Sequence, residues 1–143
     1  MDNKITEITA YKPLYRETVQ KLMDQLTTHH VQLTEDTFKQ ILTSENSHLF
    51  FIWQNDEIAG MLTVGTYYSP TGGKAWIEDV VIDSRFRGKG LSKKLVAHAI
   101  EFAKSQQIPT LMLTSNPKRT AANKLYQAME FNPKETNVYK MNL

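Results

Sequence analysis

The chain has 143 residues, which fits one domain, because domains usually contain roughly 100–200 residues. Its 41% hydrophobic content can build one core, and its formal net charge of +2 argues against nucleic-acid binding by bulk electrostatics. The chain has no cysteine, which excludes disulfides, thiolate metal sites and a cysteine nucleophile. We therefore expect a single domain over residues 1–143.

The first residues are polar and lack the apolar core of a signal peptide. No apolar run approaches the roughly 20 residues that cross a bilayer. These features predict a cytoplasmic protein without a membrane partner. His29 and His30 have no second cluster of metal-type ligands beside them, so we expect no metal site.

Hydrophobic periodicity predicts the elements of the chain. The alternation of period two predicts strands, and apolar residues at helical spacing predict helices. In chain order we expect a strand at Ile5–Ala10, a helix at Pro13–Thr27, a helix capped by Thr34, strands at His48–Gln54, Ile58–Tyr68 and Ala75–Ile82, a helix at about Gly88–Gln106, a strand at Thr110–Thr114, a helix from Asn116 to about Met129 and a last strand at Val138–Leu143. This order predicts one mixed α/β domain.

The turn after the strand Ala75–Ile82 carries the clearest functional signal. Gly88 and Gly90 let the backbone approach a ligand closely, and the helix that follows offers unpaired N–H groups to a phosphate. The basic side chains of this turn add positive charge. Two well-known phosphate motifs do not fit, because Lys93 replaces the third glycine of the dinucleotide fingerprint and Ala75 interrupts the P-loop pattern after Lys74.

The spacing Arg85-x-x-Gly88-x-Gly90 between a strand and a helix resembles the Q/R-x-x-G-x-G/A motif of the GNAT acetyltransferase superfamily. A second stretch, Ser115–Phe131, resembles that superfamily's N-x-x-A-x-x-x-Y-x-x-x-G-F wording, with Ala122 and Tyr126 at matching positions. The element order agrees over the whole chain. The resemblance implies an α/β fold with a mixed, splayed β-sheet flanked by helices on both faces.

The resemblance also implies that acetyl-CoA is the cosubstrate and that the turn and the parted strands hold it. The implied cofactor-binding residues are Val80, Val81, Ile82, Arg87, Gly88, Lys89, Gly90, Leu91, Ser92, Asn116, Asn123 and Tyr126. Asn116 has a purely structural alternative as a helix N-cap before Pro117.

The implied activity is direct transfer of the acetyl group to a primary amine within a ternary complex. Tyr126 would donate a proton to the leaving sulfur, and Glu78, or an ordered water, would take a proton from the amine. Glu78 and Asp79 are neighbours on a strand, so we expect them to point to opposite faces. A domain that binds acetyl-CoA without turnover, as a sensor or interaction module, is the alternative function.

The strand sequence Trp76–Val81 is similar to that of glucosamine-6-phosphate N-acetyltransferases. Those enzymes carry an acidic residue at the end of the next strand, and Leu113-Thr114-Ser115 has none. The acceptor therefore stays open among small-molecule and peptide amines. The resemblance allows a homodimer, and we expect no nucleic-acid partner. Glu130 replaces the superfamily's usual glycine, so we expect the last helix to end differently, near Asn132.

Overall fold

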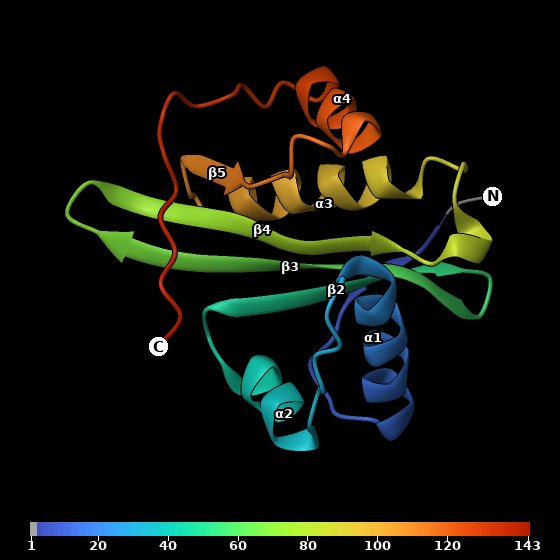
Figure 1. Ribbon diagram of the computed structural model, residues 1–143. Coiled ribbons are helices and arrows are strands. Elements are labelled where there is room, and N and C mark those ends of the chain that lie inside the picture. The colour runs from blue at the N-terminus through green and yellow to red at the C-terminus, as the bar shows by residue number, and fades with distance from the viewer. Residues whose placement is uncertain (1–2) are drawn as a thin grey trace.

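The computed structural model describes residues 3–143, and Figure 1 shows how their helices and strands are arranged. A short 3-10 turn, η1, lies between β4 and α3. In chain order the elements are β1 (Ile5–Glu7), α1 (Pro13–Leu26), α2 (Glu35–Thr43), β2 (Ser47–Gln54), β3 (Glu57–Ser69), β4 (Gly72–Ile82), η1 (Ser84–Phe86), α3 (Leu91–Ser105), β5 (Thr110–Leu113) and α4 (Thr120–Ala128). The predicted sequence of elements is confirmed as far as α4.

The five strands form one mixed sheet in the order β1-β2-β3-β4-β5. The first four strands pair antiparallel, whereas β4 and β5 pair parallel. This parallel pairing joins Lys74–Ile77 to Thr110–Leu113 only. Because β5 stops there and β4 continues to Ile82, the last part of β4 has no strand on its β5 side. The predicted mixed and splayed sheet is confirmed.

Helices cover both faces of the sheet, as Figure 1 shows. On one face α3 packs Leu95 and Val96 into the core, and both side chains are fully buried. On the other face α1 and α2 contribute Leu22 and Phe38, which are equally buried. Burying such side chains contributes about 1.5–3 kcal/mol each, so the two helical layers hold the sheet rigidly between them.

A β-bulge interrupts the pairing of β3 with β4 beside the splayed end. Thr63 is opposite Glu78 and Met61 is opposite Val81, so β4 carries one extra residue between these pairs. Asp79 takes up the extra length with a φ of 54°. The expectation that Glu78 and Asp79 point to opposite faces assumed a regular strand, and the bulge interrupts the regular alternation at this point.

The predicted last strand, Val138–Leu143, is wrong: this segment forms no strand in the structure. An alternating pattern becomes a strand only when a neighbouring strand supplies hydrogen bonds. In Figure 1 the chain leaves α4 and crosses the ends of the central strands instead of joining the sheet edge. The segment is extended and exposed over its whole length.

Two helices begin later than predicted. The helix expected from about Gly88 begins at Leu91, because Gly88 and Gly90 have φ values of 80° and 73°, outside the right-handed helical region. The helix expected from Asn116 begins at Thr120. The Asn116 side chain accepts a hydrogen bond from the Lys118 amide at 2.9 Å, so it closes a separate turn and does not cap α4.

The end of α4 also differs from the prediction. The helix ends at Ala128, and Glu130 adopts a left-handed φ of 73° where the resemblance would place glycine. The amide of Phe131 donates to the Tyr126 carbonyl and that of Glu130 to the Gln127 carbonyl, both at 3.0 Å. This is the hydrogen-bond pattern of a Schellman cap. The helix therefore ends as it would with glycine, and not near Asn132.

The left-handed glutamate leads to a stability prediction. Replacing Glu130 by Gly should raise the free energy of unfolding by about 0.5–1 kcal/mol. A residue with a Cβ costs about 1–2 kcal/mol in the left-handed conformation, and glycine avoids this cost. Part of the gain is offset because glycine gives the unfolded chain more conformational entropy. Urea unfolding measures this change. Glu130→Ala is the matched control and should give no gain, because alanine retains a Cβ. A loss of stability in Glu130→Gly would show that the Glu130 side chain contributes more than its backbone costs.

Candidate functional site

A cavity of about 450 Å³ lies at the splayed end of the sheet, between the last part of β4 and α4. Its walls come from four regions: the end of α1, the end of β4, the turn into α3, and the start of α4. The lining residues are Gln25, Leu26, Val80, Val81, Ile82, Arg87, Ser92, Arg119, Ala121, Ala122 and Leu125. We call it the β4–α4 cavity. The structure thus brings together five of the predicted cofactor residues, from Val80 to Ser92.

The turn into α3 gives this cavity a polar end. Gly88 and Gly90 are both left-handed, and a Cβ added to either would meet no atom within 4 Å, so the space in front of them is open. The amides of Leu91, Ser92 and Lys93 have no hydrogen-bond partner within residues 3–143. A helix start of this kind carries positive partial charge and unpaired donors. This cradle fits a pyrophosphate group.

Two arginines of the turn have different roles. Arg87 donates from Nε to the Ile82 carbonyl at 3.1 Å, which holds its guanidinium beside the cavity. Arg85, the first residue of the sequence motif, instead forms ion pairs with Asp83 and Glu57, each at 3.1 Å. Arg87 therefore contributes a positive charge to the lining of the β4–α4 cavity. Arg85 instead stabilises the conformation of the turn through its ion pairs.

Other predicted cofactor residues lie around this turn, in the loop before α4 and on α4 itself. Leu91 is buried in the core, so only its backbone faces a ligand. Lys89 is exposed and its ammonium lies over the Phe86 ring. Asn116 is exposed in the loop before α4. Asn123 donates from Nδ2 to the carbonyls of Asn116 and Arg119, both at 2.9 Å, which leaves only its side-chain oxygen for a ligand.

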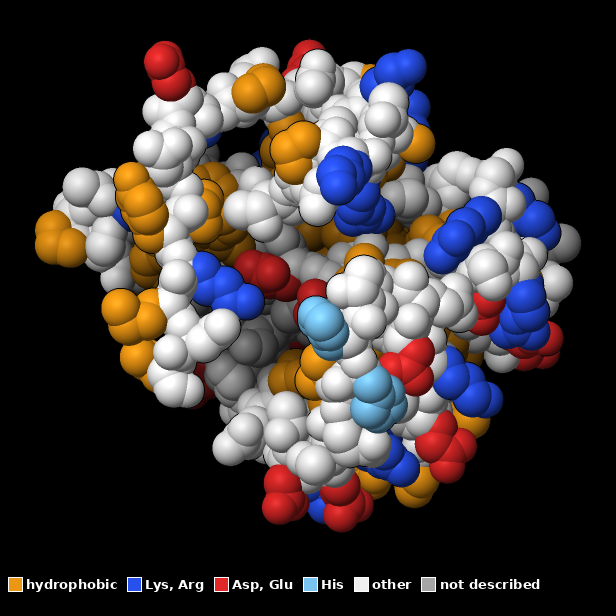
Figure 2. Space-filling view, viewed as in Figure 1, with side chains coloured by type: hydrophobic (Ala, Val, Ile, Leu, Met, Phe, Trp, Pro, Cys, Tyr) orange, Lys and Arg blue, Asp and Glu red, His pale blue; other side chains and the backbone are white. Residues whose placement is uncertain are grey.

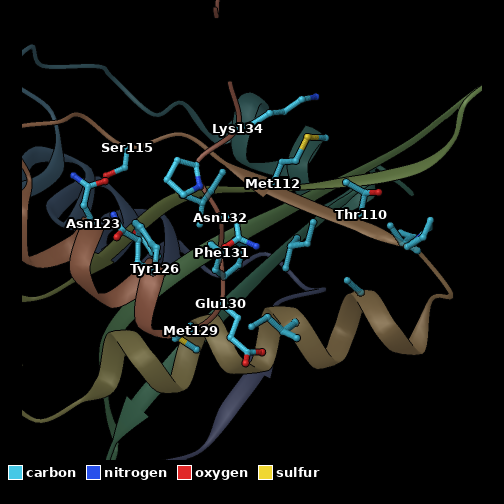
Figure 3. A pocket seen from close by; sticks show the side chains of 18 of the residues that line it. Thr110, Met112, Ser115, Asn123, Tyr126, Met129, Glu130, Phe131, Asn132 and Lys134 are labelled. Carbon is cyan, nitrogen blue, oxygen red and sulfur yellow. The ribbon is translucent and has the colours of Figure 1, made fainter. Parts of the chain in front are cut away.

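A second, larger hollow of about 790 Å³ runs along β5 and contains Tyr126. Its walls are β5, the end of α3, the second half of α4 and the chain just beyond α4. We call it the β5 groove. Figure 3 shows Ser115, Asn123 and Tyr126 together at one end of it, with Thr110 and Met112 farther along β5. Tyr126 therefore lines the β5 groove, whereas the predicted cofactor residues of β4 and of the turn into α3 line or adjoin the β4–α4 cavity.

Tyr126 is 6% exposed, and its ring packs edge-to-face on Phe131 with the centroids 6.1 Å apart. Burial raises the pKa of the Tyr126 hydroxyl, and the charge of Arg119 opposes that rise. The hydroxyl has no hydrogen-bond partner among the described residues. It therefore stays protonated at neutral pH and is free to donate a hydrogen bond.

Glu78 and Asp79 supply the acidic groups at the bulge of β4. Burial raises the pKa of Glu78, and the neighbouring charge of Asp79 raises it further. Burial likewise raises the pKa of Asp79. Neither carboxylate forms an ion pair within the described part of the chain. In Figure 2 acidic side chains lie inside a hollow on the face between α4 and α1. A carboxylate with a raised pKa and no fixed cation is suited to accept a proton.

Sequence reasoning missed three residues of the site. Arg119 adds a second cation to the β4–α4 cavity. It stands inside the second motif, and a basic residue just before a helix was the signal that could have found it. Gln25 reaches the site from α1 and accepts a hydrogen bond from the Ser84 amide at 2.9 Å, a contact that spacing does not reveal. The buried hydroxyl of Ser115 has no partner within residues 3–143, so it is available to a ligand.

Within the described residues, no group of three or more His, Asp or Glu side chains is placed to hold a metal ion. None of the helices in the same part of the chain has the length and apolar character needed to cross a membrane.

Comparison with known proteins agrees with this geometry. The model of the Acetyltransferase (GNAT) family matches residues 13–131. The N-acetylaspartate synthetase of Rattus norvegicus is 40% identical over 50 residues, which are 35% of this chain and 17% of that protein. The chain thus matches less than a fifth of the length of this curated relative.

Solved structures match over nearly the whole chain. A putative acetyltransferase from Agrobacterium tumefaciens has a TM-score of 0.85 at 21% identity, covering 97% of this chain and 99% of its own. The glucosamine-6-phosphate N-acetyltransferase of Arabidopsis thaliana has a TM-score of 0.78 at 24% identity and covers 99% of each chain. These likenesses establish the fold.

Proposed function

Because the chain belongs to the Acetyltransferase (GNAT) family, we propose that it is an acetyl-CoA-dependent N-acetyltransferase that transfers an acetyl group directly to a primary amine. The observation that carries this proposal is the β4–α4 cavity. There an unpaired strand end, two left-handed glycines, free helix amides and two arginines meet. Such a combination suits a ligand with a pyrophosphate at one end and an amide-containing arm.

Each part of the cavity has a separate binding task. The amides of Leu91–Lys93 bind the pyrophosphate, and Arg87 and Arg119 neutralise its charge. The free side of β4 beyond Ile77 offers backbone groups to the pantetheine arm, in the way that a neighbouring strand would pair. These contacts fix the position of the reacting group.

The chemical step needs a proton acceptor and a proton donor. Bound acetyl-CoA supplies a thioester whose carbonyl carbon accepts the amine. As the C–N bond forms and the C–S bond breaks, Glu78 takes the proton that the amine loses. Tyr126 gives a proton to the departing sulfur. Because the chain has no cysteine to carry the acetyl group, direct transfer is the simpler mechanism.

The acceptor belongs to the class of small-molecule or peptide amines. Two of the three similar proteins are an N-acetylaspartate synthetase and a glucosamine-6-phosphate N-acetyltransferase, whose names describe an amino acid and an amino sugar. Glu78 and Asp79, the adjacent acidic residues of β4, suit an acceptor that arrives as an ammonium ion, because opposite charges attract. A panel of amino acids, amino sugars, polyamines and peptides covers these chemistries.

Cofactor binding is tested by titrating acetyl-CoA in a calorimeter. Gly88→Glu should weaken binding by at least about tenfold, because the substitution strains a left-handed position and places a negative charge where the pyrophosphate binds. Gly72→Glu is the matched control, because Gly72 is also left-handed and open but lies in the β3–β4 turn. It should bind like the unchanged protein.

Three results would revise the proposal. Absence of binding by the unchanged protein would remove acetyl-CoA as its ligand. Equal losses in both glycine variants would mean that general destabilisation, and not the turn, explains the effect. Tight binding without thiol release from any amine in the panel would favour the alternative of a non-catalytic acetyl-CoA-binding domain.

A further inference from the structure

One face of the β3–β4 hairpin carries large side chains that neither hydrophobic core uses. The pairing of β3 with β4 is regular from the hairpin turn to the pair Thr63–Glu78, so side chains alternate between the two faces over this stretch. Ile77 is buried in the core on the α3 side, which places Trp76 and Glu78 together on the opposite face. Trp76 is half-buried and belongs to neither core. This part of the sheet face is therefore available to a ligand.

The strands on either side of Trp76 complete a flat apolar surface. Gly65 of β3 and Met112 of β5 are the sheet partners of Trp76. Figure 3 shows Met112 on the side of β5 that points away from α3. Tyr67 follows two residues after Gly65, is 46% exposed, and has the Lys74 ammonium 5.8 Å from the centre of its ring. We call Gly65, Tyr67, Trp76 and Met112 the Trp76 platform.

Neither the backbone nor the packing requires a glycine at residue 65. Gly65 does not have a positive φ, and a Cβ added there would meet only the Asn46 carbonyl oxygen, at 4.0 Å. Gly60 on the same strand differs, because a Cβ there would meet the Ile82 side chain at 2.5 Å. A glycine inside a strand weakens the strand and often marks a place where a ligand approaches closely. Gly65 thus leaves open space directly beside Trp76.

We propose that the Trp76 platform binds the acceptor of the reaction, and that this acceptor is a primary amine joined by a short chain to an aromatic ring. The ring lies against Trp76 over Gly65, and the amine reaches Glu78. Two residues along one face of a strand span about 7 Å, which a linker of roughly one to three carbons covers. This inference rests on the proposed acetyltransferase function and names its substrate class.

The charges at the two ends of the platform orient the acceptor. Glu78 and Asp79 attract an ammonium ion at one end. In Figure 2 hydrophobic side chains adjoin the acidic ones in the hollow between α4 and α1. At the other end Lys74 donates to the hydroxyls of Ser69 and Thr71, and it forms no ion pair within residues 3–143. Because this cation repels an ammonium ion, the amine of the acceptor points toward Glu78.

The chemistry of the platform favours an aromatic ring over a sugar. An aromatic ring stacks well on an indole, and the thioether of Met112 makes favourable contacts with the edge of such a ring. A sugar needs hydrogen-bond partners for its hydroxyls, because an unpaired hydroxyl is costly once it leaves water. Beside Glu78 the face offers the hydroxyl of Thr63, whereas the Lys74 ammonium is already engaged with its own hairpin. A ring without hydroxyls therefore fits this surface better.

Three amines test the acceptor class: 2-phenylethylamine carries an aromatic ring, hexylamine a flexible chain and glucosamine a sugar. Each amine is titrated calorimetrically into the protein in the presence of CoA, and its kcat/KM is measured by thiol release from acetyl-CoA. We expect 2-phenylethylamine to bind and to react about three- to tenfold better than the other two, as stacking on Trp76 predicts. Trp76→Leu should remove this advantage and leave the Kd for acetyl-CoA unchanged.

Gly65→Val separates a role in binding from a role in folding. Valine suits a strand and has room at this position, so urea unfolding should show stability equal to or above that of the unchanged protein. The added side chain fills the space beside Trp76, so KM for 2-phenylethylamine should rise at least about tenfold. Tyr68→Ala is the matched control, because Tyr68 is 73% exposed on the opposite face of the hairpin. It should keep the preference for the aromatic amine.

The calorimetric and kinetic results distinguish failure of this inference from failure of the proposed function. Absence of binding by 2-phenylethylamine, or equal or better binding of hexylamine or glucosamine, would overturn the inference even if those amines are acetylated. A preference for the aromatic amine that survives in both Trp76→Leu and Gly65→Val would also overturn it. If the preference in binding is present and depends on Trp76, but no amine releases thiol, the platform is a ligand site and the proposed catalysis is wrong.

Discussion

Replacing Tyr126 by Phe is expected to lower kcat by about 10²-fold or more and to leave the Kd for acetyl-CoA unchanged. The substitution removes one hydroxyl, which has no hydrogen-bond partner among residues 3–143, and keeps the ring that packs on Phe131. The fold should therefore be unaffected, because no buried group loses a partner. Thiol release with the best amine of the panel gives kcat, and calorimetry gives the Kd.

The matched control for this prediction is Tyr11→Phe. Tyr11 also packs edge-to-face on a phenylalanine, Phe38, but it does so on the opposite face of the sheet. This variant should keep full activity. An unchanged kcat in Tyr126→Phe would exclude Tyr126 as the proton donor and would direct attention to the unpaired hydroxyl of Ser115 at the same end of the β5 groove.

The sequence predicted the elements whose signals are local. Pro13 and the capping residue Thr34 mark the starts of two helices, and Thr34 accepts the Thr37 amide at 3.1 Å as expected. The glycine turn was also predictable, because only glycine adopts a left-handed backbone there without strain. The parting of β4 and β5 came from the resemblance to a family, and not from any residue of the strands.

The sequence could not reveal features that depend on contacts between distant segments. The bulge at Asp79 has no glycine or proline to mark it and follows from the pairing with β3. Val138–Leu143 has the alternation of a strand but no strand beside it within the chain. Asn123 carries the motif's side chain, yet its amide donors are used to hold the loop before α4. In each case the sequence shows only the local pattern, and the contacts that the segment makes or lacks elsewhere in the chain determine its structure.

Replacing Glu78 by Gln is expected to lower kcat/KM by about 10²-fold at neutral pH and to remove the loss of rate at acidic pH. In the unchanged protein the rate should fall as pH decreases through the raised pKa of Glu78, because only the carboxylate accepts a proton. A pH–rate profile of both proteins measures this. Glu101→Gln, an exposed glutamate on α3, is the control and should retain the profile. If the acidic loss persists in Glu78→Gln and disappears in Asp79→Asn, Asp79 is the base.

Glu78→Gln should lower activity but raise the free energy of unfolding at neutral pH. The pKa of Glu78 is raised from 4.5 in the folded protein, so the folded state binds the proton more tightly than the unfolded chain does. Its contribution to the free energy of unfolding is therefore present below pH 4.5 and is lost as the pH rises through the raised pKa. Glutamine carries no charge and avoids this loss. Urea unfolding at neutral pH should find Glu78→Gln more stable than the unchanged protein, with the difference vanishing at low pH. If Glu78→Gln is less active but more stable than the unchanged protein, the carboxylate is kept for its chemistry at a cost in stability. If the two proteins are equally stable at both pH values, Glu78 is fully solvated and poorly suited to act as the base.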